Sequence, residues 1–75
     1  MIGNDKKVYI ISSPDYPMDR IEEELEAERY PYNFHFGRSQ YVLMECDEVW
    51  TFGDCSDEID YLIAKDTGKS IWVMG

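Results

Sequence analysis

The stretch EVWTFGDCSDEIDYLIAKDTGKSIWV, residues 48–73, decides the fold of this chain. It opens with the apolar run EVWTF (48–52) and ends within the run SIWVM (70–74); both runs are typical of strands. Between them, Gly68 with flanking lysines is a helix stop signal. Apolar residues recur there at helical spacing and predict one helix face: Cys55, Ile59, Leu62 and Ile63. A strand, a helix and a strand in this order predict a parallel pair joined by a crossover.

The same alternation of strands and helices extends toward the N-terminus. The β-branched run KVYIIS (7–12) predicts a strand buried on both faces, and residues 18–29 have the pattern of an amphipathic helix. Alternating aromatic residues predict an edge strand at 32–36, and a short helix is expected at 40–46. We therefore predict a single α/β domain over residues 1–75. Its core would be a small four-stranded parallel sheet with flanking helices, in a Rossmann-like arrangement.

Composition limits the classes of partner. The chain has 75 residues, 44% hydrophobic and 15% aromatic, which is enough for a packed core despite a formal net charge of −9. That charge argues against direct nucleic-acid binding and leaves open a basic protein partner. No run has the length of a membrane span and no signal-peptide pattern is present, so a cytoplasmic location is expected. The spacing of Cys46 and Cys55 matches neither a zinc site nor a disulfide framework, and we predict no metal or cofactor.

The acidic turn GDCSDE (53–58) follows a predicted central strand. In open parallel sheets, ligands bind beyond the carboxyl ends of the strands, where the loop after residues 7–12 also lies. Arg38 follows the second strand at the same end and could hold a ligand phosphate, while Tyr16 could stack on a base. The predicted ligand-binding residues are Ser12, Ser13, Asp15, Tyr16, Arg38, Gly53, Asp54, Ser56 and Glu58.

Helix capping is the alternative explanation of this turn. Asp54 or Ser56 could cap the following helix, and Asp57 and Glu58 suit its positive end. If the turn is a site, its carboxylates repel phosphate, which a helix N-terminus otherwise attracts. A sugar hydroxyl, a cationic base or a developing ribosyl oxocarbenium ion would suit it better.

Three segments resemble the nucleoside 2-deoxyribosyltransferase-like family: VYIISSP (8–14), CDEVWTFGD (46–54) and EIDYLIAKDTGKSIWV (58–73). The resemblance implies that family's fold, and it implies that Glu58 is the catalytic nucleophile that takes the sugar. The two residues before Glu58 are Ser-Asp, where the family has Gly and often Thr. The chain also has about half the family's usual length. These differences favour a reduced member that binds a ligand with little or no turnover.

The function that follows is binding, including sequestration, of a nucleoside or nucleotide-derived small molecule. A phage or mobile-element protein that removes a host signalling nucleotide would be an example. Two strand edges and many aromatic residues also predict a homodimer or larger homo-oligomer. One alternative is an N-glycosidase or deoxyribosyltransferase with Glu58 as nucleophile. The other is an acidic protein-interaction inhibitor or DNA mimic, which would use the Glu22–Glu28 helix to dock a basic protein.

Overall fold

A computed structural model describes residues 6–37 and 39–74 of the chain, and it confirms the predicted α/β class. Four parallel strands form one sheet in the order β2-β1-β3-β4: β1 (Lys7–Ser12), β2 (Asn33–Phe36), β3 (Glu48–Phe52) and β4 (Ser70–Val73). Three helices flank the sheet: α1 (Met18–Glu28), α2 (Gln40–Glu45) and α3 (Ile59–Asp66). None of the helices in this described part is long and apolar enough to cross a membrane.

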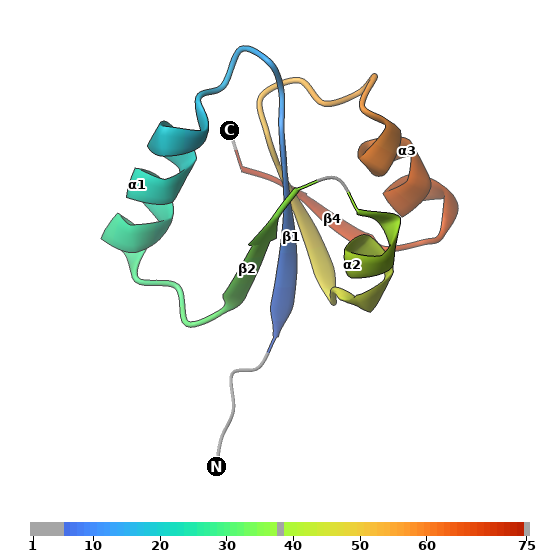
Figure 1. Cartoon of the computed structure of the whole chain (residues 1–75), viewed down its shortest axis with the longest axis horizontal. Helices are drawn as coiled ribbons and strands as arrows, with labels where there is room; N and C mark the ends of the chain where they lie inside the picture. Colours follow the sequence, from blue (N-terminus) through green and yellow to red (C-terminus); the bar gives the residue numbers. More distant parts are fainter. Residues whose placement is uncertain (1–5, 38, 75) are drawn as a thin grey trace.

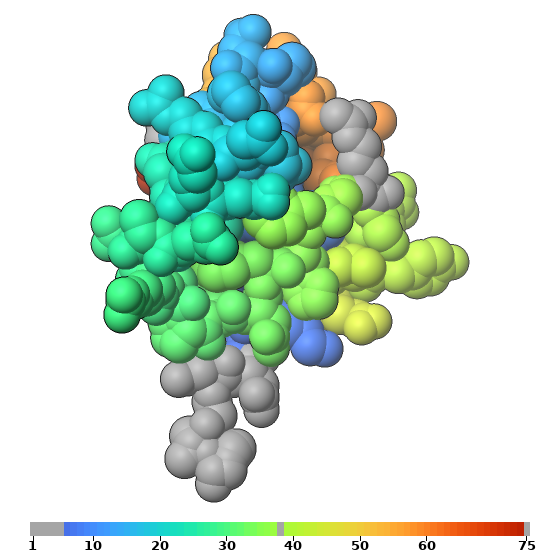
Figure 2. All heavy atoms as spheres, turned by 60° about the vertical axis from the view of Figure 1, so that its left-hand side comes forward, coloured from blue at the N-terminus to red at the C-terminus, as the bar shows by residue number. Residues whose placement is uncertain are grey.

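The helices cover opposite faces of the sheet. Figure 1 shows α1 on one face and α2 with α3 on the other. Figure 2 shows the first of these faces, where α1 lies against β2. Alternate residues of β1 and β3 point to the two faces, and two buried clusters result. The cluster under α1 contains Val8, Ile10, Ile21, Leu25, Trp50 and Phe52. The cluster under α2 and α3 contains Tyr9, Ile11, Leu43, Cys46, Val49, Cys55 and Ala64.

The central and edge strands differ as their sequences predict. Four successive residues of β1 are buried, because the strand packs against helices on both faces. β2 lies at one edge, directly after a loop that contains Pro31, which has no N–H to give to a sheet neighbour. β4 lies at the other edge, where Trp72 is 55% exposed and Val73 is 76% exposed.

The predicted face of the helix after β3 is half right: Cys55 and Ile63 pack into the core cluster, whereas Ile59 and Leu62 do not. α3 begins at Ile59, so Cys55 precedes it in an irregular turn closed by a 3.0 Å hydrogen bond from Glu58 N to Cys55 O. Ile59 is 69% exposed and Leu62 is 50% exposed, whereas Ala64 is fully buried against the sheet. The turn takes up the first four residues of the periodic pattern. Of the three helical residues predicted for the buried face, only Ile63 therefore packs against the core, together with Ala64.

Candidate functional site at the carboxyl ends of β1 and β3

The sheet order creates a crevice between β1 and β3. These strands are neighbours, but the chain leaves β1 toward β2 at one edge and leaves β3 toward β4 at the other. The two connections diverge and open a space at the carboxyl ends of the strands, which is where ligands bind in sheets of this order. The loops after the two strands are held together below that space by a 2.9 Å hydrogen bond from Ser13 N to Phe52 O.

Gly53 lets the two loops approach closely. Its φ of +82° lies in the left-handed region that favours glycine. A Cβ atom at this position would lie 2.2 Å from Ser13 Oγ and 3.0 Å from Ser13 Cβ. Both residues were predicted as part of the site, and the structure places them in contact. Their contact closes the space between the two loops.

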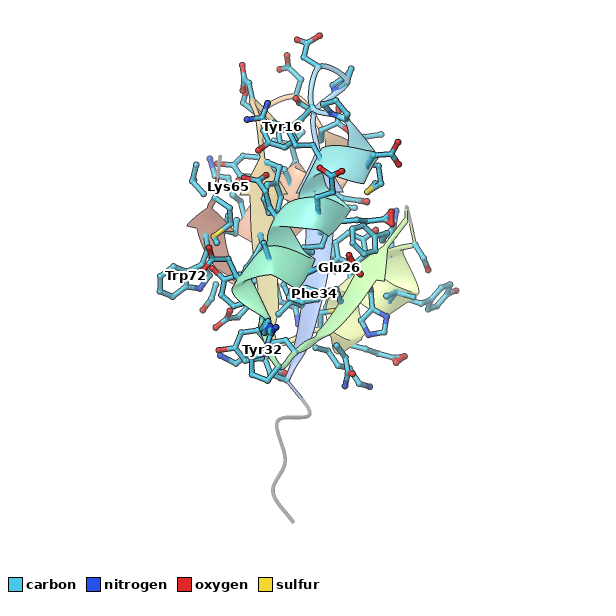
Figure 3. The ribbon with its side chains drawn as sticks, turned by 90° about the vertical axis from the view of Figure 1, so that its left-hand side faces the viewer. Tyr16, Glu26, Tyr32, Phe34, Lys65 and Trp72 are labelled. Carbon is cyan, nitrogen blue, oxygen red and sulfur yellow. The ribbon has the colours of Figure 1, made fainter. Side chains whose placement is uncertain are left out.

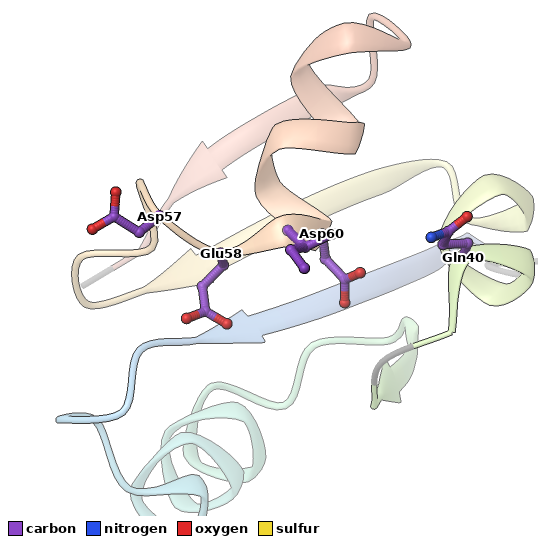
Figure 4. Close-up of a pocket in the computed structure, with 5 residues that line it drawn as sticks. Gln40, Asp57, Glu58 and Asp60 are labelled. Carbon is purple, nitrogen blue, oxygen red and sulfur yellow. The ribbon is translucent and has the colours of Figure 1, made fainter.

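Two hollows open at the start of α3 and share the side chains of Glu58 and Asp60. The larger, of about 390 Å³, is lined by Gln40, Asp57, Glu58, Ile59 and Asp60. The smaller, of about 140 Å³, is lined by Ile10, Ile11, Ser12, Met18, Gly37, Glu58 and Asp60. Figure 4 shows Glu58 and Asp60 extending to the same side from the start of α3, while Asp57 extends away from them. We call these two hollows together the switch-point pocket.

Tyr9 positions Asp60. The Tyr9 hydroxyl lies 2.8 Å from Asp60 Oδ2, contacts the carbonyl of Gly37 and accepts a 3.1 Å hydrogen bond from Ser39 N. Burial of the ring, together with the hydrogen bond to Asp60, raises the pKa of Tyr9 to about 12. The hydroxyl is therefore neutral at ordinary pH and ties α3 to the loop between β2 and α2. Asp60 was missed by the sequence analysis, and its place in the first turn after Glu58 was the only signal for it.

Two of the predicted site residues line the pocket directly. Ser12 lines the smaller hollow and Glu58 lines both. Asp54 and Ser56 are exposed and bond to each other: Asp54 Oδ1 accepts hydrogen bonds from Ser56 N at 3.2 Å and from Ser56 Oγ at 2.8 Å. These bonds lower the pKa of Asp54. Neither Asp54 nor Ser56 caps α3, because Glu58 is its N-cap residue and no side chain makes a cap hydrogen bond there. Asp57 and Glu58 do lie at the positive N-terminal end of the helix, as the capping alternative expects.

The remaining predicted residues lie away from the pocket lining. Tyr16 is on the α1 side of the sheet, where its ring centroid is 5.6 Å from that of Phe52 and its hydroxyl donates a 2.7 Å hydrogen bond to Glu24. Asp15 is exposed in the loop after β1, outside the lining of both hollows. Arg38 lies outside the described residues.

The switch-point pocket is acidic. Asp57, Glu58 and Asp60 face or border it, and none of the residues described as its lining is a lysine or arginine. Cys55 lies buried beside it, with its Sγ 3.5 Å from the carbonyl oxygens of Ile11 and Phe52. Burial raises the pKa of the Cys55 thiol, and the nearby carboxylates raise it further. The thiol is neutral and suited to packing, not to nucleophilic attack.

The switch-point pocket can accept hydrogen bonds from hydroxyl groups or attract a cation, and its negative charge disfavours the binding of a phosphate.

Comparison with protein-family models, curated proteins and solved structures found no match to this chain. The resemblance to nucleoside 2-deoxyribosyltransferase-like proteins, and the nucleophilic role that it implies for Glu58, therefore stay predictions.

Proposed function

We propose that this protein binds a nucleoside or a nucleoside-derived small molecule in the switch-point pocket, with little or no turnover. The observation that carries the proposal is the pair Glu58 and Asp60, which both hollows share at the carboxyl ends of β1 and β3. Two adjacent carboxylates can accept hydrogen bonds from the vicinal hydroxyls of a ribose. The larger hollow, of about 390 Å³, falls within the usual size of small-molecule sites, roughly 300–1,000 Å³.

The charge of the lining narrows the ligand class. With three carboxylates and no described cation in the lining, a phosphate inside the pocket would be repelled. We therefore favour a nucleoside, or a derivative whose phosphates extend into solvent. Ser12 at the end of β1 offers a hydroxyl to the base or sugar, and the apolar side chain of Met18 borders the same hollow.

Retention and release of ligand test the proposal. Excess protein is incubated with a mixture of nucleosides, nucleotides and ADP-ribose-type molecules and then filtered, and the filtrate is chromatographed before and after the protein is heated. A nucleoside that disappears and returns intact on heating supports binding. Free base and sugar would instead show an N-glycosidase, with Glu58 the first candidate nucleophile. If every compound passes through unchanged, the proposal is wrong.

Three variants locate the binding. Asp60→Asn and Glu58→Gln each remove one charged acceptor from the pocket, and each should weaken binding about 10- to 100-fold. Asp54→Asn is the matched control, because it removes the same charge from an exposed residue outside the lining. Equal losses in all three variants would show attraction to net charge and would refute the assignment of the pocket. If turnover is observed and survives in Glu58→Gln, the nucleophile is another residue.

A further inference from the structure

Another hollow lies on the opposite face of the sheet, at the other end of the strands. It has a volume of about 230 Å³ and is lined by Lys6, Tyr30, Tyr32, Glu48, Trp50, Trp72 and Met74. Lys6 directly precedes β1 and Glu48 begins β3, so this hollow is at the amino ends of the strands. Figure 3 shows Tyr32 beyond the C-terminal end of α1 and Trp72 at the edge of the sheet. We call this hollow the aromatic pocket.

The rings of Tyr30 and Tyr32 stack on each other at an interplanar angle of 15°, and both stand at large angles to the ring of Trp50. The ring centroids of Tyr30 and Trp50 are 5.0 Å apart with an interplanar angle of 78°, and those of Tyr32 and Trp50 are 5.9 Å apart at 89°. Trp50 is buried, whereas Tyr30 and Tyr32 are half-buried, so the two tyrosines and Trp72 form the accessible aromatic wall of the pocket. Trp72, which lines the same pocket, is 55% exposed.

The ammonium group of Lys6 already lies against this aromatic wall. Lys6 Nζ lies 5.0 Å from the centroid of the Tyr32 ring and 3.0 Å from Glu48 Oε2. Trp50 Nε1 donates a 3.0 Å hydrogen bond to the other carboxylate oxygen of Glu48. Burial alone would raise the pKa of Glu48, but the hydrogen bonds from Trp50 and Lys6 outweigh it and lower that pKa. The wall of the pocket therefore combines aromatic faces with an ionised carboxylate that is only 17% exposed.

We propose that the aromatic pocket is a recognition site for an alkylammonium group, which takes the place of the Lys6 ammonium beside Glu48 and the aromatic rings. The faces of aromatic rings attract cations through their quadrupoles. Aromatic pockets therefore suit methylated ammonium groups, which are weakly hydrated. The formal net charge of −9 also draws cations toward the protein. This site is independent of the switch-point pocket, which lies at the opposite end of the strands.

Titration with tetramethylammonium chloride tests the proposal, with sodium chloride at equal ionic strength as the reference. The chain has two tryptophans, and both line the aromatic pocket, so their two indole N–H signals in a ¹H–¹⁵N spectrum report on this place. We expect saturable shifts with tetramethylammonium that sodium does not produce. Choline and a peptide carrying trimethyl-lysine, compared at equal concentration, distinguish a free small molecule from a protein side chain as the source of the group.

The variants separate a specific site from general attraction. Lys6→Met removes the resident cation and should tighten tetramethylammonium binding about tenfold, whereas Glu48→Gln should weaken it about tenfold. Lys7→Met is the matched control, because it removes the same charge one residue away and Lys7 is not part of the lining. The folded state of each variant is checked in the same spectra. Equal effects of Lys6→Met and Lys7→Met, or shifts in the native protein that sodium reproduces, would overturn the proposal.

Discussion

Substitution of Gly53 by alanine should be far more costly than substitution of Gly68, although both have a positive φ. Gly53 has a φ of +82° and Gly68 a φ of +76°, so alanine is strained by about 1–2 kcal/mol at either position. A more restricted unfolded chain offsets about 0.4–1 kcal/mol of that cost. At Gly68 nothing lies within 4 Å of the added Cβ, whereas at Gly53 it meets Ser13 Oγ at 2.2 Å. Overpacking of this kind costs a further amount of about 1–3 kcal/mol.

Urea unfolding followed by tryptophan fluorescence measures the difference, because Trp50 is buried in the core. A domain of this length has a total stability of about 4–11 kcal/mol, so the loss in Gly53→Ala would be a large fraction of it. Ser13→Ala removes the hydroxyl that the new methyl group would meet. The double variant should therefore be more stable than the sum of the two single changes by about 1 kcal/mol.

Equal losses in Gly53→Ala and Gly68→Ala would refute the reasoning. They would show that the loops after β1 and β3 do not approach as closely as the structure has them. The arrangement of these two loops, on which the positions of Ser12 and Glu58 depend, would then differ from the one described.

Three further predictions concern other parts of the molecule. Tyr9→Phe should lower the free energy of unfolding by about 1–3 kcal/mol at pH 7, because the hydrogen-bonding partners of a buried hydroxyl lose it. Since the pKa of Tyr9 is raised from 10.0 to about 12, its stabilising effect is complete below pH 10 and is lost as the pH rises to 12. Urea midpoints of the native protein should fall across that range, and those of Tyr9→Phe should fall less. Burial raises the pKa of both Cys46 and Cys55, so a thiol reagent at pH 7.5 should label them only after urea is added; rapid labelling of the native protein would contradict their burial. If the expected homo-oligomer forms through the β4 edge and the exposed side of α3, Leu62→Lys and Val73→Lys should each shift its mass by light scattering to that of a monomer, and an unchanged mass would exclude that interface.

Most of the fold was predictable because its strands and helices have strong local patterns. The apolar, β-branched run of β1 and the helix stop signal at Gly68 can be recognised from the sequence without any knowledge of the tertiary structure. The orientation of α3 was not predictable, because periodicity gives the spacing of apolar residues but not the residue at which the helix begins. That start decides whether Leu62 or Ala64 faces the core.

The site was predictable in its position and only partly in its members. Ser12 ends β1 and Glu58 ends the loop that follows the neighbouring strand β3, so both positions follow from the topology. Asp60 depends on a hydrogen bond to Tyr9 across 51 positions of the chain, which no local pattern indicates. Tyr16 was expected at the pocket, but the ring of Phe52 and the carboxylate of Glu24 hold it on the other face.

The register of the sheet also has a consequence for the speed of folding. Lys7 pairs with Asn33, Val8 with Glu48 and Glu48 with Ser70, so every strand pair joins segments far apart in the chain. The described sheet has no hairpin to form early, and a long loop must close before the first strand pair gains any hydrogen bond. We expect this chain to fold more slowly than a helical bundle of the same length. Substitutions in β1 that weaken its contacts with both neighbours should slow folding more than they speed unfolding.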